Sequence, residues 1–190
     1  METLSSLSTQ PVRSNRALRA EAMLAAVLVF GSAAVSAQSP PQADVSGWNV
    51  YRNETMGFET RYPGTWQVRP VKGTGPETVM LSETPQAGKP QLAVQFWVQR
   101  NINPNGLPVE QWYADQLRRM NAAPPPTTNT SIGGRSTVRM EHVGAFGRQF
   151  QFFTSLNKTD IFEITVKQPA SQEQLDETYR KLISTLRFMP

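Results

Sequence analysis

The chain has 190 residues, a formal net charge of +4 and no cysteine. The lack of cysteine excludes cysteine nucleophiles, disulfide bonds and a lipoprotein-type lipid anchor, so an exported domain of this chain would rest on its core alone. The basic residues are scattered, and Arg118-Arg119 and Arg180-Lys181 are the only adjacent pairs. Because nucleic-acid binding usually needs a basic stripe with interleaved aromatics, we expect no nucleic-acid partner.

The first 37 residues have the order of a secretory signal. Three arginines within residues 13–19 precede the apolar run 22–35, and Val35-Ser36-Ala37 then places small residues before Gln38. The run is shorter than the ~20 apolar residues of a membrane span, although a single-pass anchor or a buried helix is the alternative interpretation. We expect residues 1–37 to be cleaved as a signal peptide. The remaining chain would then be periplasmic or secreted, with no stable membrane span.

Residues 38–47 (QSPPQADVSG) have the Pro/Ser/Gln composition of a flexible linker, which leaves residues 48–190 as one domain. In its first half, alternating apolar and polar residues predict strands. We expect strands at 58–62, 78–82 and 91–100, with 66–71 as a return strand after the Pro63-Gly64 turn. Pro108 and the helical spacing of Val109, Trp112, Tyr113, Leu117 and Met120 predict an amphipathic helix over 108–121, which the prolines of 122–126 end.

The second half predicts a β-meander followed by a helix. Strand 130–132 leads into the turn dipeptide Gly133-Gly134, and strands 135–143, 148–157 and 160–167 follow. Ser171 and Gln174 have the spacing of a capping box. After it, apolar residues recur at helical spacing and predict an amphipathic C-terminal helix: Leu175, Tyr179, Leu182, Ile183 and Leu186.

The stretch from Trp48 to Trp66 carries five aromatic residues and a Gly57-Phe58, Tyr62-Pro63, Trp66 pattern. This pattern resembles the opening hairpin of the PsbP-like (Mog1/PsbP) family and its bacterial extracytoplasmic relatives. The resemblance extends over about residues 46–190 and implies an α+β fold, in which a mainly antiparallel β-sheet has helices packed on it as an α/β/α sandwich. Members of that family do different jobs, so the resemblance implies a fold and no chemistry.

The residue types that carry catalysis are sparse. His142 is the single histidine, and with Val138 and Met140 it falls on the apolar face of its strand, as a core or edge histidine does. Glu141 and Glu163 lie at outward positions of strands that we expect to be neighbours, where solvated charge is the simpler explanation and a hydrolytic carboxylate pair the alternative. Cofactor-binding and metal-binding patterns are not apparent, and we expect no cofactor and no metal.

Trp97 and Phe153 lie on the polar faces of strong strands. Either the helix at 108–121 covers them, or they form an exposed patch that binds a partner. We therefore expect an exported, non-enzymatic accessory or binding protein that contacts an envelope protein or a small ligand. A carboxylate-dependent hydrolase of the periplasm or exterior is the alternative. A third interpretation is an envelope stress or assembly factor that binds through its exposed sheet or the loop 124–128.

Overall fold

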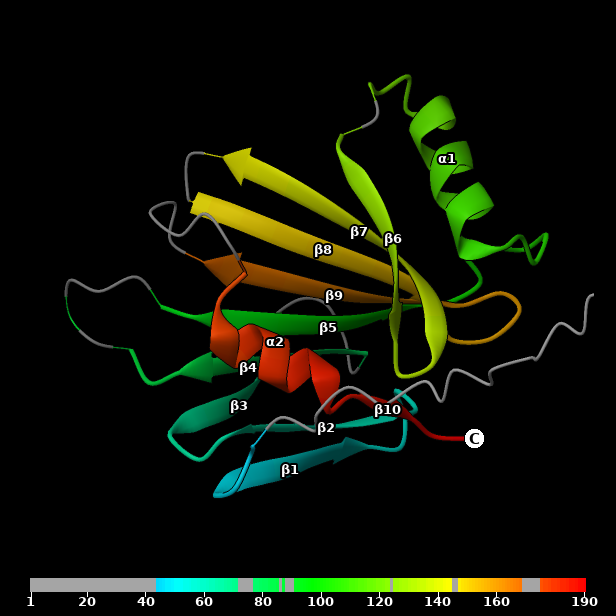
Figure 1. Ribbon diagram of the computed structural model, residues 1–190. Coiled ribbons are helices and arrows are strands. Elements are labelled where there is room, and N and C mark those ends of the chain that lie inside the picture. Colours follow the sequence, from blue (N-terminus) through cyan, green and yellow to red (C-terminus); the bar gives the residue numbers. More distant parts are fainter. Residues whose placement is uncertain are drawn as a thin grey trace, which may run out of the picture. The chain divides into compact units, whose positions relative to one another are not determined.

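A computed structural model describes residues 44–71, 77–85, 87, 91–123, 125–144, 147–168 and 175–190. The predicted leader 1–37, most of the linker and the capping box lie outside these residues. The described chain forms ten strands and two helices, with five strands before the first helix, four between the helices and one after the second (Figure 1). Every strand pair is antiparallel. The predicted α+β class is therefore confirmed. No helix in the described chain is both long and apolar enough to cross a membrane.

A seven-stranded sheet forms the centre of the domain, in the order β3-β4-β5-β9-β8-β7-β6. Its strands match the predicted segments to within a few residues, because successive side chains of a strand point to opposite faces of the sheet. Their bounds are β3 (Trp66–Pro70), β4 (Thr78–Glu83), β5 (Ala93–Gln99), β6 (Thr127–Ile132), β7 (Arg135–Gly144), β8 (Gly147–Ser155) and β9 (Ile161–Gln168).

One face of this sheet carries the main core. Phe96, Phe162 and Ile164 on its central strands are fully buried, and they pack against helix α2 (Glu177–Ser184), whose Tyr179 and Leu182 are also fully buried. The helix was predicted to begin near Ser171, but it begins at Glu177. The Asp176 side chain caps it by accepting a hydrogen bond from the Thr178 N–H (2.8 Å), so Leu175 precedes the helix.

A small three-stranded sheet packs on the same face beside α2. Its order is β1-β2-β10, with β1 (Trp48–Asn53), β2 (Phe58–Pro63) and β10 (Arg187–Phe188). The opening hairpin is therefore β1-β2, joined by a turn with Gly57 at φ +73°. The strand predicted to return along 58–62 after Pro63-Gly64 is β3. That prediction of its partner is wrong, because β3 pairs with β4. The Phe58 ring, 4.9 Å from that of Phe162, ties this sheet to the larger one.

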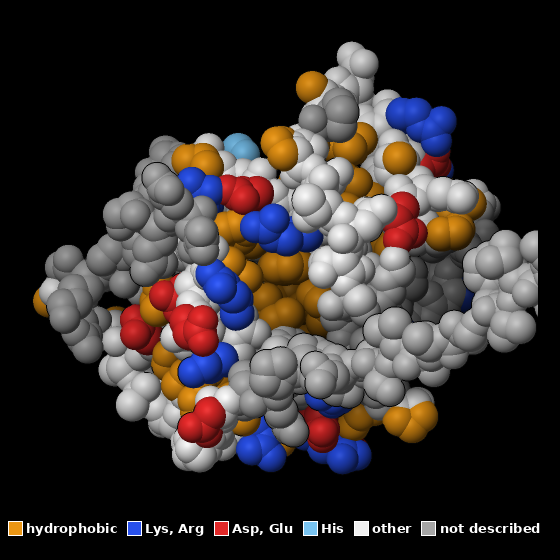
Figure 2. All heavy atoms as spheres, in the orientation of Figure 1, with side chains coloured by type: hydrophobic (Ala, Val, Ile, Leu, Met, Phe, Trp, Pro, Cys, Tyr) orange, Lys and Arg blue, Asp and Glu red, His pale blue; other side chains and the backbone are white. Residues whose placement is uncertain are grey.

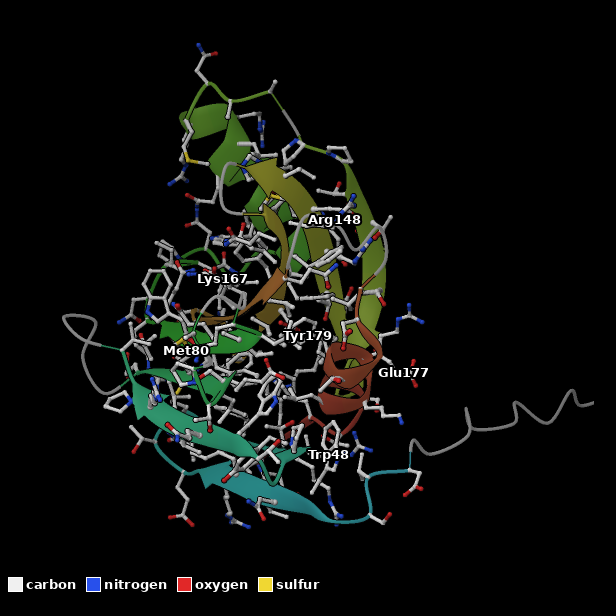
Figure 3. All side chains as sticks on the ribbon, turned by 90° about the vertical axis from the view of Figure 1, so that its left-hand side faces the viewer. Trp48, Met80, Arg148, Lys167, Glu177 and Tyr179 are labelled. Atoms are coloured by element: carbon white, nitrogen blue, oxygen red, sulfur yellow. The ribbon has the colours of Figure 1, made fainter. Side chains whose placement is uncertain are left out.

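The other face of the large sheet carries helix α1 (Val109–Arg119), close to its predicted position. Its Trp112 and Tyr113 are buried in a second, smaller cluster with Phe153 of β8. Pro108 takes the N-cap position instead of the first helical one. The two helices thus cover opposite faces of one sheet, as Figure 3 shows from the side. This is the α/β/α arrangement expected from the sequence.

Candidate functional site: an arginine-lined groove beside α2

A groove of about 400 Å³ opens between strand β6, strand β7 and helix α2. Figure 2 shows hydrophobic side chains exposed at its floor, with Lys and Arg side chains around them. The apolar lining comes from both sides of the groove, and two arginines complete it: Ile132, Phe152, Leu175, Ile183, Arg139 and Arg180. Concave, mostly apolar sites with a few polar groups are the usual form of a small-molecule site.

One of these two arginines, Arg139, belongs to a cluster of two arginines and one acid. Arg139 of β7 and Arg148 of β8 both pair with Glu141, the former at 3.3 Å between Nη2 and Oε2. The guanidinium of Arg139 also lies 4.8 Å above the centre of the Phe150 ring. All four residues lie on the face of the sheet that holds α2. Along β7 and β8 they alternate with the residues that contact α1, so their side chains point the other way (Figure 3 labels Arg148). The cluster carries a net charge of +1.

This cluster is short of hydrogen-bond acceptors and of negative charge. Burial, together with the nearby Arg148, lowers the pKa of Arg139. Among the described residues, the buried Nε of Arg148 has no hydrogen-bond partner. A buried cation without a full set of partners is costly, so an anion at this place would be favourable. Guanidinium groups bind carboxylates and phosphates with two parallel hydrogen bonds.

The structure separates the two residues of the predicted partner-binding patch. Phe153 is 8% exposed, because the rings of Trp112 and Tyr113 on α1 lie 5.8 Å and 5.3 Å from it. Trp97 is 40% exposed, and α1 does not cover it. Helix α1 therefore covers Phe153, as one alternative expected, and leaves Trp97 exposed. The loop 124–128 is also shorter than expected, since β6 begins at Thr127.

The carboxylate pair considered from the sequence does not form. Glu141 is on β7 and Glu163 is on β9, with β8 between them, and their side chains are on opposite faces of the sheet. Glu163 is buried, contrary to its predicted solvated position. His142 is exposed and so is no core residue. Across the described residues, no three His, Cys, Asp or Glu side chains gather as metal ligands would.

The groove has no counterpart in the sequence analysis. Its walls come from residues 130–139, 152 and 175–184, which become neighbours only through the sheet order and the packing of α2. One available signal was Arg139, a long charged side chain that shares a strand face with Glu141. Alternation alone did not reveal whether that face met solvent or a helix.

No protein-family model matches the chain, and no curated protein matches it. Among solved structures, a crystal structure from Bacteroides thetaiotaomicron VPI-5482 has 10% identity and a TM-score of 0.49 over 76% of this chain. The chain spans about half (49%) of that protein. The solution structure of cyanobacterial PsbP (CyanoP) from Synechocystis sp. PCC 6803 has 12% identity and a TM-score of 0.49, and the match covers 79% of this chain and 97% of that protein.

A PsbP structure is thus found among the similar solved structures. The likeness at this level of identity concerns the fold. Nothing about ligands, partners or reactions follows from it, and the function is argued below from the residues of this chain.

Proposed function

We propose that this protein is an exported, non-enzymatic binding domain that acts in the periplasm or outside the cell. Its ligand is an organic anion with an apolar body, of which an alkyl carboxylate is the simplest case. The groove beside α2 is its site, and the observation that carries the proposal is the pairing of an apolar floor with an arginine cluster of net charge +1.

The two parts of the groove suit the two parts of such a ligand. The side chains of Phe152 and Ile183 offer apolar surface, and burial of apolar area contributes about 25 cal/mol per Å². The Arg139 guanidinium offers donors to a carboxylate, and a hydrogen bond to a charged group is worth about 1.5–3 kcal/mol. The one acid of the cluster, Glu141, is already shared by two arginines. This arrangement favours holding an anion over proton transfer.

A set of ligands that differ only in the head group tests the proposal. We expect decanoate to bind the purified domain, and decylammonium and decanol to bind at least tenfold more weakly, as measured by isothermal titration calorimetry. Arg139→Gln should weaken decanoate binding by about tenfold to hundredfold, the equivalent of one charge-assisted hydrogen bond. Arg139→Lys should retain part of the affinity, because it keeps the charge and loses the paired donors.

The matched control is Arg119→Gln, which makes the same change of charge on the far side of the sheet, at the end of α1. It should leave decanoate binding unchanged. Equal affinity for decanoate and decylammonium, or equal effects of the two glutamine variants, would contradict the proposed site. Turnover of ester, glycoside, peptide or phosphate substrates that Glu141→Gln or His142→Ala abolishes would contradict the non-enzymatic role.

The exported state has its own test. If residues 1–37 are a signal peptide, the protein recovered from the cell envelope or medium should begin at Gln38, as read by N-terminal sequencing. Recovery of the full chain from the cytosol would contradict export while leaving the ligand-binding test intact.

A further inference from the structure

A single row of side chains crosses the face of the large sheet that holds α1. Cross-strand partners place Trp97 of β5, Glu163 of β9, Phe153 of β8 and Val138 of β7 directly opposite one another in turn. Helix α1 covers the Phe153 end of the row. The Trp97 end is exposed, and the buried carboxylate of Glu163 (8% exposed) lies between the two ends.

The carboxylate of Glu163 is held by neutral donors. The side-chain amide of Gln99 donates to Oε2 (2.7 Å). The side-chain amide of Gln151 donates to Oε1 (3.1 Å), and so does the Thr165 hydroxyl (2.9 Å). Within the described chain, no lysine or arginine forms an ion pair with it. Buried carboxylates are normally paired with a cation, because removing the charge from water is costly.

The orientation of the two amides makes the site rich in acceptors. Since a carboxylate only accepts, Gln99 and Gln151 must direct their NH₂ groups at Glu163, which turns their carbonyl oxygens away from it. In the described part of the chain, neither carbonyl oxygen receives a hydrogen bond, and both side chains are half-buried. Two free acceptors and a negative charge therefore lie beside the exposed indole of Trp97.

We propose that this site, Trp97 with Glu163, Gln99 and Gln151, binds an arginine side chain presented by a partner protein. A guanidinium group has only donors, is permanently charged and stacks on aromatic faces, so it can lie against the Trp97 ring while it donates to the amide oxygens and compensates the carboxylate. An exposed tryptophan is also among the residue types that dominate protein interfaces. The site is on the opposite face from the arginine-lined groove and is independent of it.

Two short peptides that differ in one group test the proposal on the full domain. One carries a single arginine among glycine and serine, and the other carries citrulline, which has nearly the same shape without the charge. Binding is followed by NMR through the indole N–H resonance of Trp97, assigned with Trp97→Phe. We expect the arginine peptide to bind at least tenfold more tightly than the citrulline peptide and to shift this resonance. Equal affinities would overturn the proposal.

Variants separate recognition from folding. Isothermal titration calorimetry compares the variants, because Trp97→Ala removes the indole resonance. Trp97→Ala should reduce the affinity for the arginine peptide at least tenfold, whereas Met120→Ala, which removes another exposed apolar side chain, should not change it. Glu163→Gln should abolish the preference for arginine over citrulline. If that variant does not fold, the Trp97→Ala comparison still decides, and unchanged affinity there would overturn the proposal. Free N-acetylarginine amide that binds as tightly as the peptide would overturn the assignment to a protein segment.

Discussion

The two faces of the seven-stranded sheet differ in what covers them. On one face, α2 and the three-stranded sheet together enclose a core that includes Phe58, Phe96, Phe162 and Tyr179. On the other face, α1 packs over β7 and β8 and encloses a smaller cluster around Phe153. The same strands serve both faces, because successive side chains point to opposite sides.

This difference shows how one central strand can be buried on both sides and yet carry different chemistry on each. In β9, Phe162 and Ile164 enter the apolar core, while Glu163 and Thr165 form a hydrogen-bonded polar group on the face of α1. Stability is therefore concentrated on the α2 face, and the buried polar group of the α1 face lies beside the exposed Trp97. Four comparisons between equivalent positions test this division.

The largest losses of stability should come from truncating one phenylalanine on each face. Phe162 is fully buried, and its ring lies 4.9 Å from Phe58 and 5.2 Å from Phe188. Phe162→Ala should reduce the free energy of unfolding by about 4–5 kcal/mol, the upper part of the range for such cavities. Phe153→Ala should cost about 3 kcal/mol, since α1 can relax over the space. Urea denaturation measures both, and equal or reversed losses would contradict the division.

Much of this two-faced arrangement was predictable from local sequence. The alternation in β8 placed Phe150 and Phe152 on one side and Phe153 on the other, and the structure confirms it. The Gly133-Gly134 turn is also confirmed, with φ of +57° and +78°. These features depend on neighbouring residues, whose side-chain period and backbone requirements the sequence expresses directly.

The predictions that failed concern residues and strands whose neighbours in the fold are distant in sequence. Glu163 alternates with apolar residues as a solvated charge would, but it is buried, and Gln99 and Gln151 from other strands donate hydrogen bonds to its carboxylate. The pairing of β3 with β4, and the groove beside α2, follow from the order of strands. The sequence analysis therefore named Trp97, which is exposed, and did not reveal the groove.

Acid should release the loop that leads into α1. Asp160 is buried, which raises its pKa, but hydrogen bonds from the Asn101 N–H, Arg100, Asn157 and Thr159 lower it more, to about 2 from 3.8. A lowered pKa in the folded state means that the contribution is complete above the unfolded value and is lost as the pH falls from about 4 through 2. It amounts to about 2 kcal/mol at neutral pH.

Asp160→Asn should remove this contribution and flatten the acid side of the stability profile. Urea denaturation at pH 7 and at low pH measures both effects. The exposed Asp44, whose pKa is lowered by hydrogen bonds from Ser46, gives the control Asp44→Asn, which should leave the profile almost unchanged. An Asp160→Asn variant that keeps the steep acid limb of the native protein would show that other carboxylates cause it.

Tyrosine hydroxyls on the two faces should also differ. The Tyr179 hydroxyl of α2 accepts a hydrogen bond from the Ala93 N–H (3.1 Å) and donates to the Lys167 carbonyl (2.5 Å), at the ends of β5 and β9. Tyr179→Phe removes both hydrogen bonds and should cost about 2 kcal/mol. The Tyr113 hydroxyl on α1 donates only to the Met140 sulfur (3.1 Å), a weak acceptor. Tyr113→Phe should therefore cost about 0.5 kcal/mol or less, and equal losses would contradict the comparison.

Trp97 should contribute little to stability, although it stands in the same cross-strand row as Phe153. Large apolar side chains contribute to folding through the area that they bury, and Trp97 is 40% exposed without a covering helix, whereas Phe153 is 8% exposed beneath α1. Trp97→Ala should therefore lower the free energy of unfolding by about 1 kcal/mol or less, the range of most surface substitutions. Thermal unfolding of the two alanine variants side by side measures the difference. A loss as large as that of Phe153→Ala would mean that the indole is part of the core and is not available to a partner.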